Sequence, residues 1–178
     1  MIVLIIDDEP LSRRVLRRLL SRFPEIDMRE AEDGQVALNQ LAEFTPALIF
    51  CDLLMPVMDG VTFMRQVRAS EAWRHIPMIV TSASKDRELL GQVKDLQVAD
   101  YLLKPFDLVQ TFARIEKHLD PLLKRFRAEK AAAAEAERAA AQAAAEAAAQ
   151  PQQVFTAPAP VPPPDLGGPP AGDSATAA

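Results

Sequence analysis

The segment ALIFCDLLMPVMDG, residues 47–60, combines the two features that decide the fold of this chain. An apolar run ends directly in the carboxylate of Asp52. Such a run is typical of a strand covered on both faces of a parallel sheet. A charge at the end of a buried strand is costly unless another group pairs with it or it takes part in chemistry. We therefore expect Asp52 to have a partner or a chemical role.

Four other segments have strand patterns, and helical patterns lie between them. Residues 2–6, 78–82 and 99–103 are short apolar runs, whereas residues 26–31 alternate apolar and polar, as an edge strand does. Apolar side chains at helical spacing begin near residues 11, 36, 61, 89 and 108. Five strand–helix alternations predict an α/β fold with a five-stranded parallel sheet. We expect the doubly wound, flavodoxin-like (βα)5 strand order 2-1-3-4-5.

Composition changes near residue 120 and divides the chain into three parts. We expect one α/β domain over residues 1–120. Residues 121–149 form an extension, in which 14 of the 19 residues from 131 to 149 are alanine. High alanine content favours a helix, although large side chains to pack it are missing. Residues 150–178 contain eight prolines and no apolar period, which predicts a disordered or polyproline-like tail.

Charge and cysteine content exclude several classes of protein. The net charge of −5 gives no general attraction to nucleic acid or to an anionic membrane surface. The single cysteine, Cys51, rules out an intrachain disulfide and fits a reducing compartment. The first apolar run stops at Asp7, which is too short for a signal peptide or a membrane span. We expect a cytoplasmic protein.

Polar residues follow four of the predicted strands. Asp7 and Asp8 follow the first strand, Asp52 the third, Ser82 the fourth and Lys104 the fifth. Because ligands of open α/β sheets bind at the carboxyl ends of the strands, and the first and third strands are neighbours, we expect three carboxylates close together. Their mutual repulsion favours a hard divalent cation, for which Mg²⁺ is the natural choice. Together with Lys104 and the Ser82 hydroxyl, these carboxylates and the cation would be suited to phosphoryl transfer to a carboxylate.

Several of these features also have purely structural interpretations. Asp7, Asp8 and Glu9 would serve as caps of the helix that begins near Pro10, although this explains one acid and not a pair beside Asp52. Asp59 is expected to cap a helix or form a turn. Cys51 alternates away from Asp52 and is expected in the core. The two histidines are expected to be surface or structural residues; they are His75 and His118.

The blocks IIDDEP, CDLLMPVMDG, VTSAS and YLLKPF occur in this order within residues 1–119. Together they resemble the signature of the response-regulator receiver domain, the CheY-like fold of two-component signalling. The resemblance implies that Asp52 is the phosphoacceptor. It also implies that Asp8 binds Mg²⁺ directly, that Asp7 supports the ion through water or as a partial ligand, and that the backbone carbonyl of Leu54 is the third protein ligand.

The same resemblance implies a switch. Ser82 would be the switch hydroxyl, Tyr101 the aromatic switch, and Lys104 the contact to the phosphoryl group, with a cis bond to Pro105. Ser82 stands where many relatives have threonine. In the family, the side chains at two further positions often tune the lifetime of the phosphoryl group. Here these positions are Leu54 and Ser84, whose side chains are uncharged, and we leave that lifetime open.

We therefore expect a stand-alone response regulator and not a turnover enzyme. A histidine kinase or a histidine phosphotransfer protein would donate the phosphoryl group, and the aspartyl phosphate would hydrolyse itself. Output would be a change in protein–protein contacts at the face made by the fourth helix, the fifth strand and the fifth helix. A second copy of the chain is one alternative for that partner. The arginine-rich first helix, with Arg13 and Arg22 at its ends, is either a solvated face or the docking surface for the phosphodonor.

Two other functions remain open at the level of sequence. A phosphatase with an aspartyl-phosphate intermediate would have a D-x-D pattern after the first strand, whereas this chain has DDEP at residues 7–10. An inactive scaffold would lack one of the key residues, yet Asp8, Asp52 and Lys104 are all present. The extension and tail, residues 121–178, are interpreted as a flexible spacer, a partner-binding strip or a segment without function. The alanine-rich helix would continue the fifth helix and disturb the output face.

Overall fold

The computed structural model describes residues 1–83 and 87–149, with 87–90 and 146–149 described as backbone only. Ser84 and the predicted disordered tail at 150–178 lie outside the described residues. The chain divides into a unit from Met1 to Ala136 and a second that begins at Glu137. Within the described ranges, no helix combines the length and the apolar composition that crossing a membrane requires.

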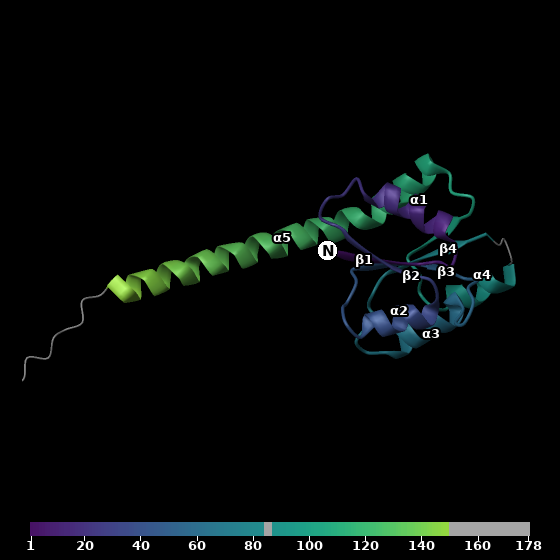
Figure 1. The fold of residues 1–178 in the computed structure, drawn as a ribbon, viewed down its shortest axis with the longest axis horizontal. Helices are drawn as coiled ribbons and strands as arrows, with labels where there is room; N and C mark the ends of the chain where they lie inside the picture. Colours follow the sequence, from purple (N-terminus) through teal and green to yellow (C-terminus); the bar gives the residue numbers. More distant parts are fainter. Residues whose placement is uncertain (84–86, 150–178) are drawn as a thin grey trace, which may run out of the picture. The chain divides into compact units, whose positions relative to one another are not determined.

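Five strands and five helices alternate along the chain. Figure 1 shows how these elements are arranged in the first unit. Their order is β1 (Ile2–Ile6), α1 (Pro10–Leu20), β2 (Asp27–Ala31), α2 (Gly34–Leu41), β3 (Leu48–Asp52), α3 (Gly60–Ala69), β4 (Met78–Ser82), α4 (Arg87–Lys94), β5 (Asp100–Leu103) and α5 (Leu108–Ala149). Every neighbouring pair of strands is parallel, in the order β2-β1-β3-β4-β5. The predicted α/β fold, with its flavodoxin-like order, is confirmed.

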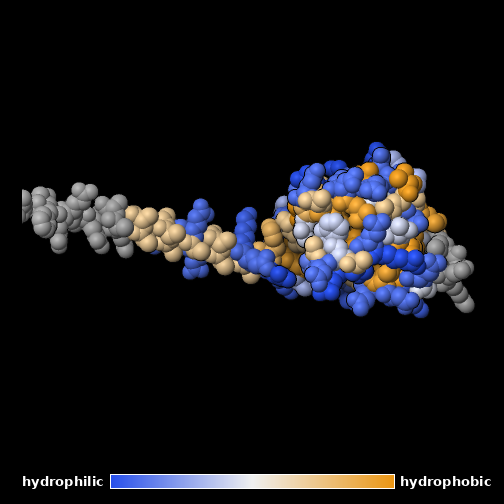
Figure 2. All heavy atoms as spheres, turned by 90° about the horizontal axis from the view of Figure 1, so that it is seen from below, coloured by the Kyte–Doolittle hydropathy of each residue, from blue (hydrophilic) through white to orange (hydrophobic). Residues whose placement is uncertain are grey.

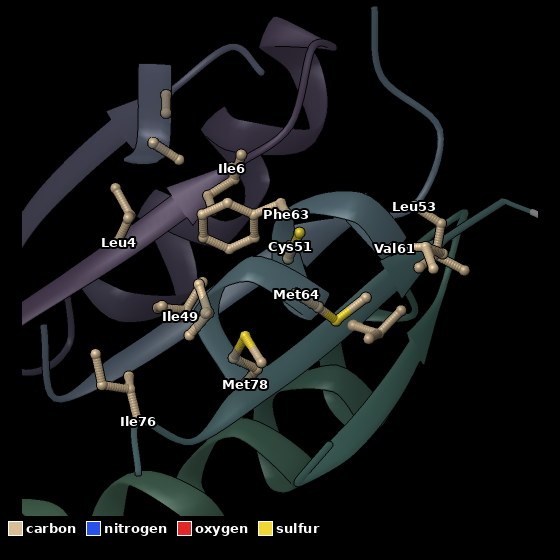
Figure 3. Packing of buried hydrophobic residues seen from close by; sticks show 14 of the residues in the cluster. Leu4, Ile6, Ile49, Cys51, Leu53, Val61, Phe63, Met64, Ile76 and Met78 are labelled. Carbon is tan, nitrogen blue, oxygen red and sulfur yellow. The ribbon is translucent and has the colours of Figure 1, made fainter. Parts of the chain in front are cut away.

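The sheet is covered on both faces, and successive residues of a strand point to opposite faces. On one face, Leu4 and Ile6 of β1 join a buried cluster with residues of α2, α3 and α4. Figure 3 shows Phe63 and Met64 of α3 pointing into this cluster, beside Cys51 of β3. On the other face, residues of β1 and β3 pack with α1 and α5; they are Val3, Ile5, Leu48 and Phe50.

Burial along the strands follows their place in the sheet. All residues of β3 and β4 are buried, as expected for central strands covered on both faces. The pattern of β2 alternates, and this strand lies at the edge of the sheet, as predicted. Cys51 is fully buried in the core, which confirms its predicted structural place. Desolvation raises the pKa of its thiol well above the ordinary value.

The last helix, α5, continues through Pro121 without a break. Its apolar residues Ile115, Leu119 and Leu123 are all buried against the sheet. Arg127 forms an ion pair with Glu25, with Nη2 and Oε1 2.6 Å apart. Residues 128–145 are exposed and mostly alanine. Figure 2 shows hydrophilic residues, in blue, at intervals along this part of the helix. The helix therefore has a packed first part and an alanine-rich part without packed side chains.

Candidate functional site

Three carboxylates meet where β1 and β3 end. Ligand oxygens of Asp7, Asp8 and Asp52 all lie within 4.8 Å of one another. The register pairs Ile6 with Cys51, so the residues that follow them in the two strands are adjacent. Asp7 is fully buried and Asp52 is 5% exposed, whereas Asp8 is exposed. The predicted acidic cluster is thus present, with one carboxylate open to solvent.

Lys104 is the cation of this cluster. Its Nζ lies 2.6 Å from Asp52 Oδ2, 2.9 Å from Asp7 Oδ2 and 3.9 Å from a carboxylate oxygen of Glu9. Burial lowers the pKa of the ammonium, but hydrogen bonds to Asp52 and Asp7 outweigh it and hold that pKa above its ordinary value. Burial is also the largest influence on Asp7 and raises the pKa of its carboxyl group. The lysine is therefore charged and fixed between two carboxylates.

The end of β3 is held tightly around Asp52. The Leu53 N–H donates to Asp52 Oδ1 over 2.7 Å, and the Gly60 N–H donates to the Leu53 carbonyl over 3.0 Å. A Cβ on Gly60 would lie 1.9 Å from the Asp52 carbonyl oxygen, so only glycine lets α3 begin this close to the strand. Asp59 caps α3 by accepting from the Thr62 N–H, as predicted.

The short loop after β1 is held by its own side chains. The Asp7 N–H donates to the Ala31 carbonyl, and Asp7 Oδ1 accepts from the Glu9 N–H over 3.0 Å. Glu9 occupies the N-cap position of α1, but its side chain makes no capping bond; it accepts from the Ser12 hydroxyl over 2.6 Å. The interpretation of Asp7 and Asp8 as helix caps is therefore wrong.

The other residues that the sequence singled out lie on β4, on β5 and after β3. Ser82 ends β4, is 2% exposed, and its carbonyl accepts from the Lys104 N–H over 2.9 Å. Tyr101 of β5 packs against the cluster that contains α3, and its buried hydroxyl has no hydrogen-bond partner among the described residues. The side chain of Leu54 is 56% exposed. The Lys104–Pro105 bond is cis, as the resemblance implied.

The donor set fits a small divalent cation. Three carboxylates with one lysine leave an excess of negative charge in a space where the oxygens are only a few ångströms apart. Oxygen-only ligands and an open side suit Mg²⁺, which retains several of its waters. Asp8, which faces solvent, and the two buried aspartates would hold the ion. When bound, Mg²⁺ would neutralise charge that develops on phosphoryl oxygens.

The sequence interpretation missed the role of Arg13. Its Nη1 donates to the Asp7 carbonyl over 2.6 Å, and its Nε donates to Glu30 over 2.9 Å. Sequence pattern placed this residue on a charged helix face. Nothing in the sequence indicates that β2 brings a carboxylate to it, because that contact depends on how α1 packs beside the sheet.

Comparisons with known proteins agree with the fold. Residues 3–116, more than half of the chain, match the response regulator receiver domain family. The chemotaxis protein CheY-3 of Vibrio cholerae is 31% identical over 123 residues, which cover 69% of this chain and 92% of CheY-3. The sensor histidine kinase TmoS of Ectopseudomonas mendocina is 39% identical over 113 residues. That match covers 64% of this chain and spans only 11% of the kinase.

Solved structures show the same relationship. The response regulator receiver protein of Pseudomonas putida is 32% identical, with a TM-score of 0.59 over 65% of this chain and 95% of its own. A response regulator from Chloroflexus aurantiacus is 28% identical, with a TM-score of 0.60 over 67% of this chain and 97% of its own. Five parallel strands in receiver order, acids at two strand ends and these matches lead to one conclusion. The chain belongs to the response-regulator receiver domain family, a family of signalling domains and not of substrate-turnover enzymes.

Proposed function

We propose that this protein is a phosphorylation switch in which Asp52 accepts a phosphoryl group. The observation that supports this most directly is the buried Asp52, whose side chain is 8% exposed, with Lys104 Nζ at 2.6 Å from its carboxylate and two more aspartates within 4.8 Å. A purely structural ion pair would not need the second and third acids. Buried carboxylates gathered around a single lysine are instead suited to a metal-supported nucleophile.

The chain's own residues account for the transfer step. A carboxylate oxygen of Asp52 attacks the phosphorus of a phosphohistidine, the P–N bond breaks, and its electron pair returns to the histidine nitrogen. Lys104 pairs with Asp52 before the step and with a phosphoryl oxygen after it. Ser82, which ends the next strand, offers its hydroxyl to another phosphoryl oxygen. Asp7 and Asp8 would hold the cation, with the Leu54 carbonyl as a further ligand.

Phosphorylation would bias the conformation near β4 and β5. The added dianion draws Ser82 and Lys104 inward, and Tyr101 adjusts beside them. The face formed by α4, β5 and α5 then changes its affinity for a partner, as a population shift. The aspartyl phosphate ends by self-hydrolysis, so the protein does not turn over an external substrate. We propose a cytoplasmic regulator that changes its affinity for a protein partner or for a second copy of the chain.

The phosphodonor that we propose is a histidine kinase or a histidine phosphotransfer protein. A region of this chain is similar to part of a protein named as a sensor histidine kinase. The exposed arginines of α1 offer a basic surface to such a donor; they are Arg14, Arg17 and Arg18.

Intact-protein mass spectrometry after incubation with acetyl phosphate tests the proposal. The wild-type protein with Mg²⁺ is expected to gain one phosphoryl group, and chelation of the metal is expected to prevent this. Asp52→Ala removes the acceptor and should show no adduct. Asp95→Asn is the matched control, because it removes an exposed aspartate outside the cluster and should be phosphorylated like the wild type.

The outcomes separate the competing functions. An adduct on Asp52→Ala would place the acceptor elsewhere and contradict the proposal. Continuous release of phosphate from small phosphate esters would indicate a phosphatase. An intact donor and an unmodified protein, also after incubation with phosphorylated histidine kinases, would indicate a scaffold.

A further inference from the structure

Arg13 of α1 connects the acidic site to the edge strand of the sheet. Its Nη1 donates to the backbone carbonyl of Asp7 over 2.6 Å, and its Nε donates to Glu30 Oε2 of β2 over 2.9 Å. The Arg13 side chain is only 18% exposed, so both contacts are largely shielded from water. A guanidinium has several donors in a rigid plane, which lets one side chain hold two acceptors in a set geometry.

Glu30 is itself held in place. Arg17 Nη1 contacts its other carboxylate oxygen at 2.7 Å, and the Gln40 side chain donates to the Glu30 carbonyl over 2.8 Å. Burial raises the pKa of Glu30, but the hydrogen bonds from Arg17 and Arg13 outweigh burial and leave that pKa lowered. Glu30 is therefore a charged and oriented acceptor that restrains the Arg13 guanidinium.

The contact between Arg13 and Asp7 completes the restraints on one residue, Asp7. The Asp7 N–H donates to β2, its carboxylate accepts from the Glu9 N–H, and its carbonyl accepts from Arg13. That carbonyl belongs to the peptide bond that joins Asp7 to Asp8. Holding it fixes the plane of the peptide and hence where the Asp8 backbone starts, although the Asp8 side chain is exposed.

We propose that Arg13, oriented by Glu30, is a positioning residue that holds the Asp7–Asp8 peptide in the arrangement required for a divalent cation. This inference rests on the proposed function, because it concerns the same metal site. Residues that orient the ligands of a metal typically contribute about tenfold or more to metal affinity. Arg13 would act through hydrogen bonds and not through its charge, since a positive charge near the site opposes cation binding.

Loss of the Arg13 hydrogen bonds should weaken Mg²⁺ binding, whereas loss of its positive charge alone should strengthen it. Measuring Mg²⁺ affinity in suitable variants therefore separates the two effects. Isothermal titration calorimetry with MgCl₂ would measure the Kd of the wild type, Arg13→Ala, Arg13→Lys and Arg14→Ala. Arg14→Ala is the matched control: it removes the same charge from the next position of the same helix, but among the described residues Arg14 makes no hydrogen bond or ion pair with Asp7 or Glu30. The amide resonance of Asp8 and the thermal midpoint of each metal-free protein are recorded alongside.

We expect Arg13→Ala to weaken Mg²⁺ binding about tenfold and to move the Asp8 amide resonance. Arg13→Lys keeps the positive charge but loses the planar guanidinium that holds two acceptors. It is therefore expected to bind Mg²⁺ almost as weakly as Arg13→Ala. Arg14→Ala is expected to bind within about twofold of the wild type, or slightly tighter, because a cation is removed.

Each contrary result overturns a different statement. Wild-type affinity in Arg13→Lys, together with tighter binding in Arg13→Ala, would show that only charge matters. Equal losses in Arg13→Ala and Arg14→Ala would show that the helix surface in general supports the site. If the wild type bound no Mg²⁺, the proposed metal site would fail and this inference with it. If Arg13→Ala lost affinity only in proportion to a fall in its thermal midpoint, with the Asp8 resonance unmoved, the role of Arg13 would be structural and the positioning role would be excluded.

Discussion

Lys104 Nζ lies 2.6 Å from Asp52 Oδ2, although 52 residues separate the two in the chain. The same ammonium contacts Asp7 at 2.9 Å. One cation therefore serves two buried carboxylates, and the exposed Asp8 completes a cluster with excess negative charge. Groups arranged for function in this way often lower the stability of the protein that carries them.

Asp8→Asn should make the metal-free protein more stable. The change removes one of three repelling carboxylates, and because Asp8 is exposed, the gain in the free energy of unfolding should be roughly 1 kcal/mol. The additional stability that Mg²⁺ confers on the wild type should largely disappear, because a ligand is lost. Urea unfolding with and without MgCl₂ measures both effects. Asp95→Asn should change neither, and an Asp8→Asn protein that gained stability from Mg²⁺ like the wild type would contradict the assignment.

Gly60→Ala and Gly91→Ala should change stability in opposite directions. A Cβ on Gly60 would lie 1.9 Å from the Asp52 carbonyl oxygen, so α3 must move away from the strand that carries the acceptor. We expect a loss of about 3 kcal/mol or more in the free energy of unfolding. A Cβ on Gly91 of α4 meets nothing within 4 Å, and alanine there should add up to about 1 kcal/mol.

Equilibrium urea unfolding of the two glycine variants provides the comparison. A stable Gly60→Ala protein with unchanged phosphorylation would show that the contact between α3 and β3 is not required. A loss in Gly91→Ala would show that this face of α4 is covered.

Asp100 should contribute stability that is lost in acid. Burial raises the pKa of Asp100, but hydrogen bonds from the Tyr101 N–H, Arg114 and His118 outweigh burial and leave that pKa lowered. Arg114 Nη2 lies 2.6 Å from Asp100 Oδ1, and His118 Nε2 lies 3.1 Å from Oδ2. For a carboxyl group with a lowered pKa, the stabilisation is complete above the unfolded value, about 3.9, and is lost as pH falls through the folded value.

Asp100→Asn removes this titration. The variant should be less stable than the wild type at neutral pH, and the difference should shrink as pH falls below about 4. A series of urea midpoints against pH measures the difference, with Asp95→Asn as the control. A constant difference at every pH would mean that packing, and not charge, stabilises this site.

Truncation should show how much of α5 the first unit needs. Leu123 is 3% exposed in the core, and Arg127 pairs with Glu25, so both stabilising contacts lie beyond the predicted boundary at residue 120. A chain that ends after Asp120 should lose about 2–5 kcal/mol in the free energy of unfolding, the usual cost of deleting a buried leucine. A chain that ends after Ala136 should unfold at the same urea concentration as the full chain. Equal stability of both would contradict this and support a boundary at residue 120.

The local pattern of apolar and polar residues was sufficient to predict the fold and much of the candidate site. Apolar runs that end in acids predicted β1 and β3, and the alternation at residues 26–31 predicted the edge strand, because side-chain period follows directly from backbone geometry. The carboxyl ends of parallel strands lie at one edge of a sheet, so the order of strands already predicted that Asp7, Asp8 and Asp52 would meet. The cap formed by Asp59 followed from residue type and position.

Tertiary packing decided the rest. Asp7 and Asp8 are neighbours of the same type, yet one is buried and the other exposed, because Asp7 follows the buried strand β1 directly and Asp8 lies in the bend after it. In the sequence, Arg13 does not differ from the other arginines of a charged helix. In the structure, the packing of α1 beside β2 brings it into contact with Glu30. Leu123 lies past the change in composition but reaches the core because α5 continues through Pro121.

The sequence by itself determined the elements, their order and the residues at the strand ends, because these depend on side-chain period and residue type over a few neighbouring positions. Only the tertiary structure decided which of those residues are buried, which cation pairs with which acid, and which distant side chain holds the loop after β1. Those properties arise from contacts between segments far apart in the chain, and such contacts exist only once helices and strands have packed against one another.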